Sequence, residues 1–152
     1  MIIRVKITVD DDVVRKYKIV DTSAIVFLIL VYLNDPSGWG RHGYWFEEVS
    51  HGEKVHIRLS LDETVSKECG LPSKLSCAIL NGNKMWLNAE RWFHGSAKSK
   101  LSLDDYRQYM VSHEIGHILG HEHSECPCKG CRAPVMMQQT LGIGKCKPNT
   151  SV

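Results

Sequence analysis

The sequence lacks a hydrophobic run long enough to cross a membrane as a helix. The longest apolar run, Ala24–Leu33, contains ten residues, which is about half of what a membrane-spanning helix needs. The N-terminal segment MIIRVKITVDDD alternates between apolar and polar residues and then becomes acidic, unlike a secretory signal. We therefore expect no membrane partner, and the cytoplasm is the default expectation for the location.

The chain also lacks a large excess of charge. Its 19 basic and 17 acidic side chains leave a formal net charge of +2, which gives no electrostatic reason to expect binding to nucleic acid. Internal repeats, low-complexity segments and linkers are absent too. A length of 152 residues is enough for one domain with a sizeable core, so we expect a single domain over residues 1–152. The sequence does not indicate an oligomeric state.

Cysteine, by contrast, is abundant. The six cysteines occur at close spacings and are Cys69, Cys77, Cys126, Cys128, Cys131 and Cys146. An even number at such spacings suits disulfides in an oxidising compartment. In a reducing compartment the same residues would be free thiols or would bind a second metal ion.

The first part of the chain predicts a strand followed by a helix. Ile2–Val9 alternates apolar and polar residues, as strands do. Asp21–Leu33 predicts a buried helix that is capped by Asp21 or Thr22. The β-branched part of this run, Val26–Tyr32, is also compatible with a strand.

The middle of the chain predicts further strands. Tyr44–Ser50 and Lys54–Leu61 are two strand segments that we expect to be neighbours. Asp62–Pro72 is polar, so we expect irregular structure there. Ser76–Asn88 predicts a hairpin that turns at Asn81-Gly82-Asn83, because this tripeptide is a strong turn signal.

A long helix is expected after a loop over Asn88–Lys100. Ser102 is its predicted N-cap, and Asp105 three residues later fits a capping box. The helix is expected to end at Gly120, since glycine commonly follows the last helical turn. The rest of the chain is rich in glycine, proline and cysteine and is expected to be irregular, so the predicted fold class is α+β.

Four of the eight histidines lie in the segment HEIGHILGHEH, which contains the pattern His113-Glu114-x-x-His117-x-x-Gly120-x-x-His123. His113 and His117 lie one helical turn apart, so both imidazoles can bind one cation. Glu114 lies about 100° further round the helix, where its carboxylate can reach a metal-bound water instead of the metal. This predicts a catalytic zinc site with Glu114 as its general base.

Gly120 decides which histidine is the third ligand. Glycine permits a sharp turn out of the helix, which would bring His123 back to the metal and leave a fourth position for water. His121 is the competing ligand, because an unbroken helix would align it with the first two histidines. Without the glycine and the third histidine, H-E-x-x-H alone would also fit a helix with two surface histidines.

Two methionines follow in the segment APVMMQQT, Ala133–Thr140. Met136 or Met137 can form a turn beneath the zinc histidines, as in metzincins. Alternatively, both methionines fill gaps in the core. The upstream histidine motif favours the turn.

HExxHxxGxxH followed by such a methionine resembles the metzincin clan of zinc metallopeptidases. A closer resemblance, over about Ile25 to Asn149, is to an uncharacterised zincin-like family of mostly secreted actinobacterial proteins. It rests on DPSGW, LN-x-x-RW, YRQYMVSHEIGHILGHEH and APVMMQQTLG. The resemblance implies a compact metzincin-like domain with a small mixed sheet, a backing helix, an active-site helix and an irregular Met-turn segment. It implies no established substrate.

The same resemblance places two residues of the C-terminal segment. The turn methionine follows Pro-Val in that family, which corresponds to Met136. Gln138 takes the place of a tyrosine that binds zinc or the oxyanion in some metzincins. Gln138 could therefore offer an amide N–H to the oxyanion.

Several alternatives remain for the role of the cysteines. The resemblance favours the disulfides Cys69–Cys77 and Cys126–Cys146, with Cys128–Cys131 as a CxxC pair. Alternatively, the last four cysteines bind a second, structural zinc, as in archaemetzincins, to which CPCKGC shows a weaker resemblance at a different spacing. A redox role for the CxxC pair is a third alternative, although its flanks lack a βαβ context.

The predicted function is that of a zinc-dependent metalloendopeptidase acting on peptides or proteins. The strand Lys84–Asn88 is expected to lie above the active-site helix and to pair with an extended substrate. A non-catalytic zinc-stabilised binding module and a cysteine-cluster redox or metal-handling protein are the alternatives. The cysteine content and the resemblance favour an oxidising or extracellular location over the default one.

Overall fold

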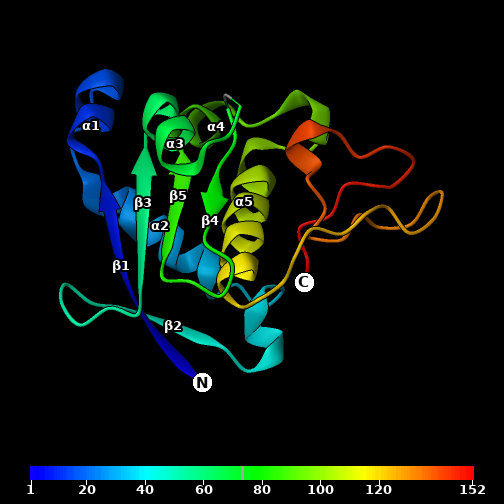
Figure 1. The fold of residues 1–152 in the computed structure, drawn as a ribbon, viewed down its shortest axis with the longest axis horizontal. Helices are drawn as coiled ribbons and strands as arrows, with labels where there is room; N and C mark the ends of the chain where they lie inside the picture. Colours follow the sequence, from blue (N-terminus) through cyan, green and yellow to red (C-terminus); the bar gives the residue numbers. More distant parts are fainter. Residues whose placement is uncertain (73) are drawn as a thin grey trace.

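The computed structural model describes residues 1–72 and 74–152 and contains a five-stranded mixed sheet (Figure 1). Its strand order is β2-β1-β3-β5-β4. Three neighbouring pairs are parallel, whereas β4 runs antiparallel to β5. The strands are β1 (Ile2–Val9), β2 (Trp45–Glu48), β3 (Val55–Ser60), β4 (Cys77–Ala78) and β5 (Lys84–Asn88).

Strand β1 lies between β2 and β3, so the prediction that these two strands are neighbours is wrong. β2 pairs with the first half of β1, with Ile2 opposite Trp45. β3 pairs with the second half, with Val5 opposite Val55. The chain crosses from one edge of β1 to the other between them. β2 and β3 continue in the same direction, and a short connection cannot make two parallel strands adjacent.

One face of the sheet carries the core. Along β1 and β3 every second side chain is buried, as the alternating sequence predicts. These side chains form one hydrophobic cluster with residues of α2 (Thr22–Leu33) and α5 (Leu103–Ile118). The buried hydrophobic residues of β1 and β3 are Ile3, Val5, Ile7, Val55, Ile57 and Leu59.

The two predicted helices are confirmed. The Asp21 side chain caps α2 by accepting a hydrogen bond from the Ser23 N–H, so the strand alternative for Val26–Tyr32 is wrong. Ser102 caps α5 by accepting from the Asp105 N–H. In Figure 1, α5 runs beside β4 and β5, and it contacts both strands. Most of its residues are buried, so α5 is the central helix of the fold.

Three short helices are additional to those predicted. They are α1 (Asp11–Tyr17), α3 (Asp62–Cys69) and α4 (Ala89–His94). The expectation of irregular structure over Asp62–Pro72 is therefore wrong, and Asn88–Lys100 is only partly a loop. α3 has acidic residues in its first turn, which suit the helix dipole, but only one buried residue, Val65. A helix this short and polar leaves no apolar periodicity to detect.

The hairpin is confirmed, with Cys77 opposite Trp86. Asn81 has a positive φ of 54°, the left-handed conformation that asparagine tolerates in tight turns. After α5 the chain is mostly irregular, apart from the 3-10 turn η3 (Gln139–Leu141). Two further 3-10 turns are η1 (Trp39–His42) and η2 (Ala97–Ser99). The α+β fold class is confirmed.

All six cysteines are paired, as Cys69–Cys77, Cys126–Cys146 and Cys128–Cys131. The disulfide alternative therefore describes the structure, and no thiolate is left for a second zinc. The Cys126–Cys146 disulfide connects the loops drawn in orange and red in Figure 1, beyond α5, whereas Cys128–Cys131 closes a short turn within the orange loop. Three disulfides are typical of an oxidising compartment. Among the described residues, no helix is both long and apolar enough to cross a membrane.

Candidate metal centre

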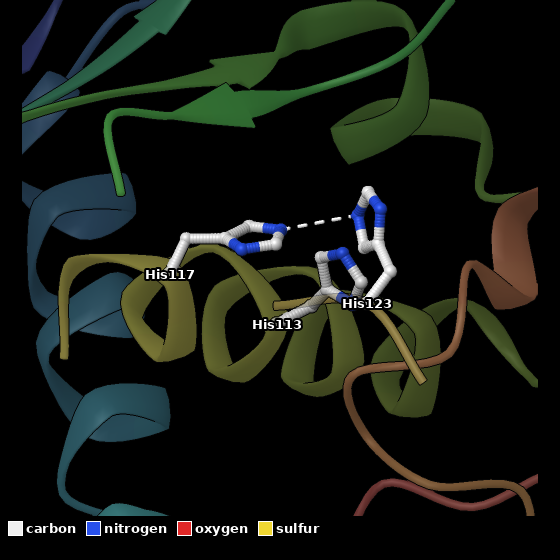
Figure 2. A group of neighbouring side chains, drawn as sticks. All are labelled: His113, His117 and His123. Carbon is white, nitrogen blue, oxygen red and sulfur yellow. Dashed lines mark hydrogen bonds between the residues drawn. The ribbon is translucent and has the colours of Figure 1, made fainter. Parts of the chain in front are cut away.

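Three histidine side chains converge beside the C-terminal half of α5 (Figure 2). One ligand nitrogen from each of His113, His117 and His123 lies within 4.8 Å of the others. The Nε2 atoms of His117 and His123 are 3.1 Å apart. Two nitrogens held tetrahedrally at about 2.1 Å from one zinc lie about 3.4 Å apart, so this spacing fits a shared metal ion.

Gly120 redirects the chain after the helix. Its φ of +98° lies in the region that favours glycine, and a Cβ atom there would lie 2.6 Å from the Asn81 Oδ1 atom. The helix therefore ends at Ile118, and the chain turns back. This turn brings His123 to the two helical histidines.

The side chain of His121 lies outside the cluster. Its ring stacks on Trp39, with ring centroids 4.6 Å apart. Its backbone carbonyl faces the cluster, because it lies 2.7 Å from the His117 Nδ1 atom. The structure thus brings together the three histidines of the predicted motif and places the competing residue elsewhere.

Backbone carbonyls orient the two helical imidazoles. The Nδ1 atom of His113 lies 2.8 Å from the Val135 carbonyl oxygen, and that of His117 contacts the His121 carbonyl. A carbonyl oxygen only accepts hydrogen bonds, so Nδ1 carries the proton in both neutral rings. In this tautomer the Nε2 atom of each ring carries the lone pair, which is directed to the position of the shared metal ion and can bind it.

The protonation states agree with this orientation. Burial lowers the pKa of His113 to about 3 and also lowers the pKa values of His117 and His123. Because a charged imidazole loses its hydration on burial, the neutral rings are favoured at neutral pH. Neutral imidazole is a preferred ligand of zinc and related transition metals, so the donor set fits a zinc ion.

Glu114 is buried next to this cluster and is only 3% exposed. Its Oε1 atom lies 3.9 Å from the His113 Nε2 atom. Its buried Oε2 atom has no hydrogen-bond partner in the part of the chain that the structure describes. Burial raises the pKa of Glu114 to about 8. A buried carboxylate without a partner destabilises the folded protein. Groups of this kind are typical of functional sites.

Met136 lies in a tight turn against the helix. The Met137 N–H donates to the Pro134 carbonyl over 2.9 Å and closes this turn. A Cβ atom at Gly116 would collide with the Met136 sulfur and approach Trp39 to 2.9 Å. The absence of a side chain at Gly116 therefore lets the turn approach α5 between the two histidine positions.

Tyr109 is a site residue that the sequence analysis missed. Its hydroxyl accepts a hydrogen bond from the Gln139 N–H at 2.9 Å and donates to the Met137 carbonyl at 2.8 Å. It also lies 3.4 Å from the His113 Nδ1 atom. Tyr109 thus joins α5 to the end of the methionine turn, at Met137, and to the chain that follows it, at Gln139. Its position four residues before His113, on the same helix face, is the signal that could have identified it.

A cavity of about 540 Å³ opens beside the histidines. Gln138 lines this cavity and is exposed. The predicted substrate-pairing strand, Lys84–Asn88, is not at the sheet edge, because β5 is enclosed between β3 and β4. The edge strand on this side of the sheet is β4, Cys77–Ala78, which also lines the cavity. Hairpin order alone does not reveal which of the two strands is outermost.

Comparisons with known proteins place the chain in a family. Residues 3–149 match the family described as "Protein of unknown function (DUF3152)". Among curated proteins, no sequence matches the chain.

Several solved structures resemble the chain at a low level of similarity. Two structures of myroilysin are 18% identical to the chain at a TM-score of 0.48, and they match 81% and 88% of it. These matches cover 49% and 46% of myroilysin, so the chain spans about half of its length. An archaemetzincin from Archaeoglobus fulgidus, complexed with malonate, is 15% identical at a TM-score of 0.47, and the match covers 98% of this chain and 95% of that one. Similarity at this level assigns neither activity nor ligand.

Proposed function

We propose that this chain, which belongs to the DUF3152 family, is a zinc-dependent peptidase that uses Glu114 as its general base. One observation carries the proposal. Three imidazole nitrogens converge beside a buried carboxylate that has no hydrogen-bond partner among the described residues, at the wall of a cavity. A purely structural metal site has no use for such a carboxylate.

His113, His117 and His123 would hold the zinc ion. Three protein ligands leave one coordination position for substrate or water, which distinguishes catalytic from structural zinc sites. When bound, zinc polarises the scissile carbonyl and lowers the pKa of a water molecule to near 7. The carbonyls of Val135 and His121 keep two of the imidazoles in the orientation that binding requires.

Glu114 would accept the proton of the attacking water and then donate it to the leaving amine. A nearby cation favours the carboxylate form and lowers its pKa from the value of about 8 that burial alone gives. The base would then be ionised at neutral pH. Its free Oε2 atom is the oxygen available to take the proton.

Other residues would position these groups or stabilise the transition state. Met136 supports the helix beneath the histidines, and Tyr109 holds the turn that carries Met136. Gln138, at the cavity wall, is our candidate for donating an amide N–H to the oxyanion. Its replacement in Gln138→Ala should lower kcat by about 10²-fold. A decrease of no more than about twofold would count against this role.

Metal analysis combined with a peptidase assay tests the proposal. The purified chain is loaded with zinc, its metal content is measured, and cleavage of a mixed peptide library is followed with and without a chelator. We expect cleavage that the chelator abolishes. Glu114→Ala should retain zinc and lose cleavage, whereas Glu125→Ala, at an exposed position, is the matched control. A Glu114→Ala protein with full activity would exclude the mechanism.

A further inference from the structure

The cavity beside the histidines extends well beyond the candidate metal centre. Its volume of about 540 Å³ lies within the usual range of ligand pockets. It reaches from α5 to the edge strand β4 and to the chain segment that follows α3. Most of the wall between these elements is apolar and includes Leu71, Leu75, Ala78, Ile79, Trp86 and Met110.

The hydroxyl groups in this wall are already paired. The Tyr106 hydroxyl is hydrogen-bonded to Thr140 over 2.7 Å, and the Tyr109 hydroxyl is held by the methionine turn. The Ser76 Oγ atom accepts from the Asn88 N–H. The indole nitrogen of Trp86 has no hydrogen-bond partner among the described residues, but it is buried beneath the surface of the wall. Away from the histidines and from Gln138, a polar side chain entering here would lose its water without gaining partners, which is unfavourable.

The charges around the cavity have one sign. Glu68 and Glu122 are exposed at its border, and Glu114 lies inside. Neither lysine nor arginine is among the described residues that line it. Away from the histidines that would hold the metal ion, an acidic side chain would therefore meet the like charges of Glu68 and Glu122, and like charges repel more strongly in a partly desolvated cavity than in water.

A disulfide holds one wall in place. Cys69 at the end of α3 is bonded to Cys77 on β4, and both residues line the cavity. The covalent bond limits how far the wall can move when a ligand enters. The cavity is therefore suited to discriminating between side chains of different size.

From these observations we propose that the cavity is a side-chain pocket. It selects peptides that carry a large apolar side chain beside the scissile bond and rejects acidic side chains. Cleavage of the bond beside that side chain rests on the proposed peptidase function. Selective binding of the side chain depends only on the cavity, so the two claims can be tested separately.

Binding of a peptide series is the first measurement. Fluorescent peptides of serine, glycine and alanine differ at one central position, which is Phe, Leu, Ala, Lys or Asp. Their affinities for the zinc-loaded Glu114→Gln protein are measured by anisotropy, and their cleavage by the unaltered protein is followed by mass spectrometry. The Phe and Leu peptides should bind roughly 10- to 100-fold more tightly than the Ala peptide, and the Asp peptide most weakly. Affinities equal within about twofold would overturn the pocket.

The two measurements also separate the two proposals. Selective binding without any cleavage supports the pocket and contradicts the peptidase function. Cleavage of all five peptides at equal rates supports the peptidase function and contradicts the pocket.

A charge introduced into the wall is the second test. Leu75→Arg should raise affinity for the Asp peptide at least about tenfold and weaken binding of the Phe peptide. Phe27→Arg, at a position on α2 that is 65% exposed, is the control and should leave the series unchanged. Leu75→Ala enlarges the cavity and should shift preference from Leu towards Phe, which tests the same wall if the arginine variant fails to fold. An unchanged series in every folded Leu75 variant would contradict the proposal.

Discussion

The candidate metal centre is built from two regions that are stabilised in different ways. His113, Glu114 and His117 lie on α5, the most completely buried helix, and are positioned by helical geometry. His123 and Met136 lie on an irregular segment that disulfides and single hydrogen bonds hold in place. His113 is only 6% exposed, whereas His123 is exposed. The helical side therefore depends on the core of the protein, whereas the loop side depends on local tethers.

The largest predicted effect concerns burial on the helical side. Burial raises the pKa of Glu114 to about 8 in the folded protein without metal, whereas the ordinary value of 4.5 applies to the unfolded chain. Between pH 4.5 and pH 8 the folded protein keeps the proton on Glu114, whereas the unfolded chain loses it. The contribution of Glu114 to stability is therefore complete below pH 4.5 and is lost as the pH rises to about 8. Glu114→Gln cannot lose a proton and should therefore gain stability relative to the unaltered protein, by on the order of 4 kcal/mol over this range.

Denaturant unfolding at pH 5 and pH 8 in the presence of a chelator measures this difference. Comparing the two proteins at each pH cancels the opposing contribution of the histidines, whose lowered pKa values make stability rise with pH up to about 6.5. Glu125→Gln is the control at an exposed position. A stability difference that does not change with pH would contradict the burial of an ionisable group here.

Removal of one ligand from each side compares the two regions directly. We expect His113→Ala and His123→Ala each to weaken zinc binding by roughly 10²- to 10³-fold, because each ligand supplies a share of the total binding energy. Only His113→Ala should also destabilise the metal-free protein, because His113 is buried and bonded to Val135. Zinc titration and thermal unfolding of both variants provide the measurement. Equal destabilisation by both would show that the two sides do not differ.

The tether of the loop side is the next target. Cys126 and Cys146 close a loop with a sequence separation of 20 residues, and a disulfide of this span typically contributes about 3 kcal/mol. The double variant Cys126→Ser, Cys146→Ser should lose about this much stability and bind zinc less tightly, since the bridge lies three residues from His123. The control, Cys69→Ser with Cys77→Ser, should leave zinc affinity unchanged. A double variant with unaltered zinc affinity would show that the tether does not position His123.

Tyr109 has the smallest predicted effect, because it connects the two sides through hydrogen bonds only. Tyr109→Phe removes its bonds to Gln139 and Met137 and should cost about 1–3 kcal/mol of stability. We expect zinc affinity to fall by about 10-fold, at the low end for a residue that supports a metal ligand. Tyr17→Phe, which loses a hydrogen bond to Glu90, is the control. Equal zinc affinities in both variants would assign Tyr109 a purely structural role.

Prediction from the sequence succeeded where one local pattern determines the outcome. The strand Ile2–Val9, the helix capped by Asp21 and the long helix capped by Ser102 each follow from periodicity and capping over many residues. Prediction failed for α3, whose eight residues contain a single buried side chain. The neighbours of β1 could not be predicted either, because strand order is decided by the packing of the whole sheet.

The candidate site divides in the same way. The amino-acid sequence alone determined that two histidines share one helix face with Glu114 beside them, because helix geometry converts a spacing of four residues into proximity. Gly120 also predicted the turn out of the helix that brings His123 to them. Only the tertiary structure decided that the His121 ring stacks on Trp39, that Tyr109 joins the helix to the methionine turn, and that the cysteines pair as three disulfides, one of which lies in the wall of the cavity. These features depend on contacts between segments far apart in the chain, and no local pattern encodes such contacts.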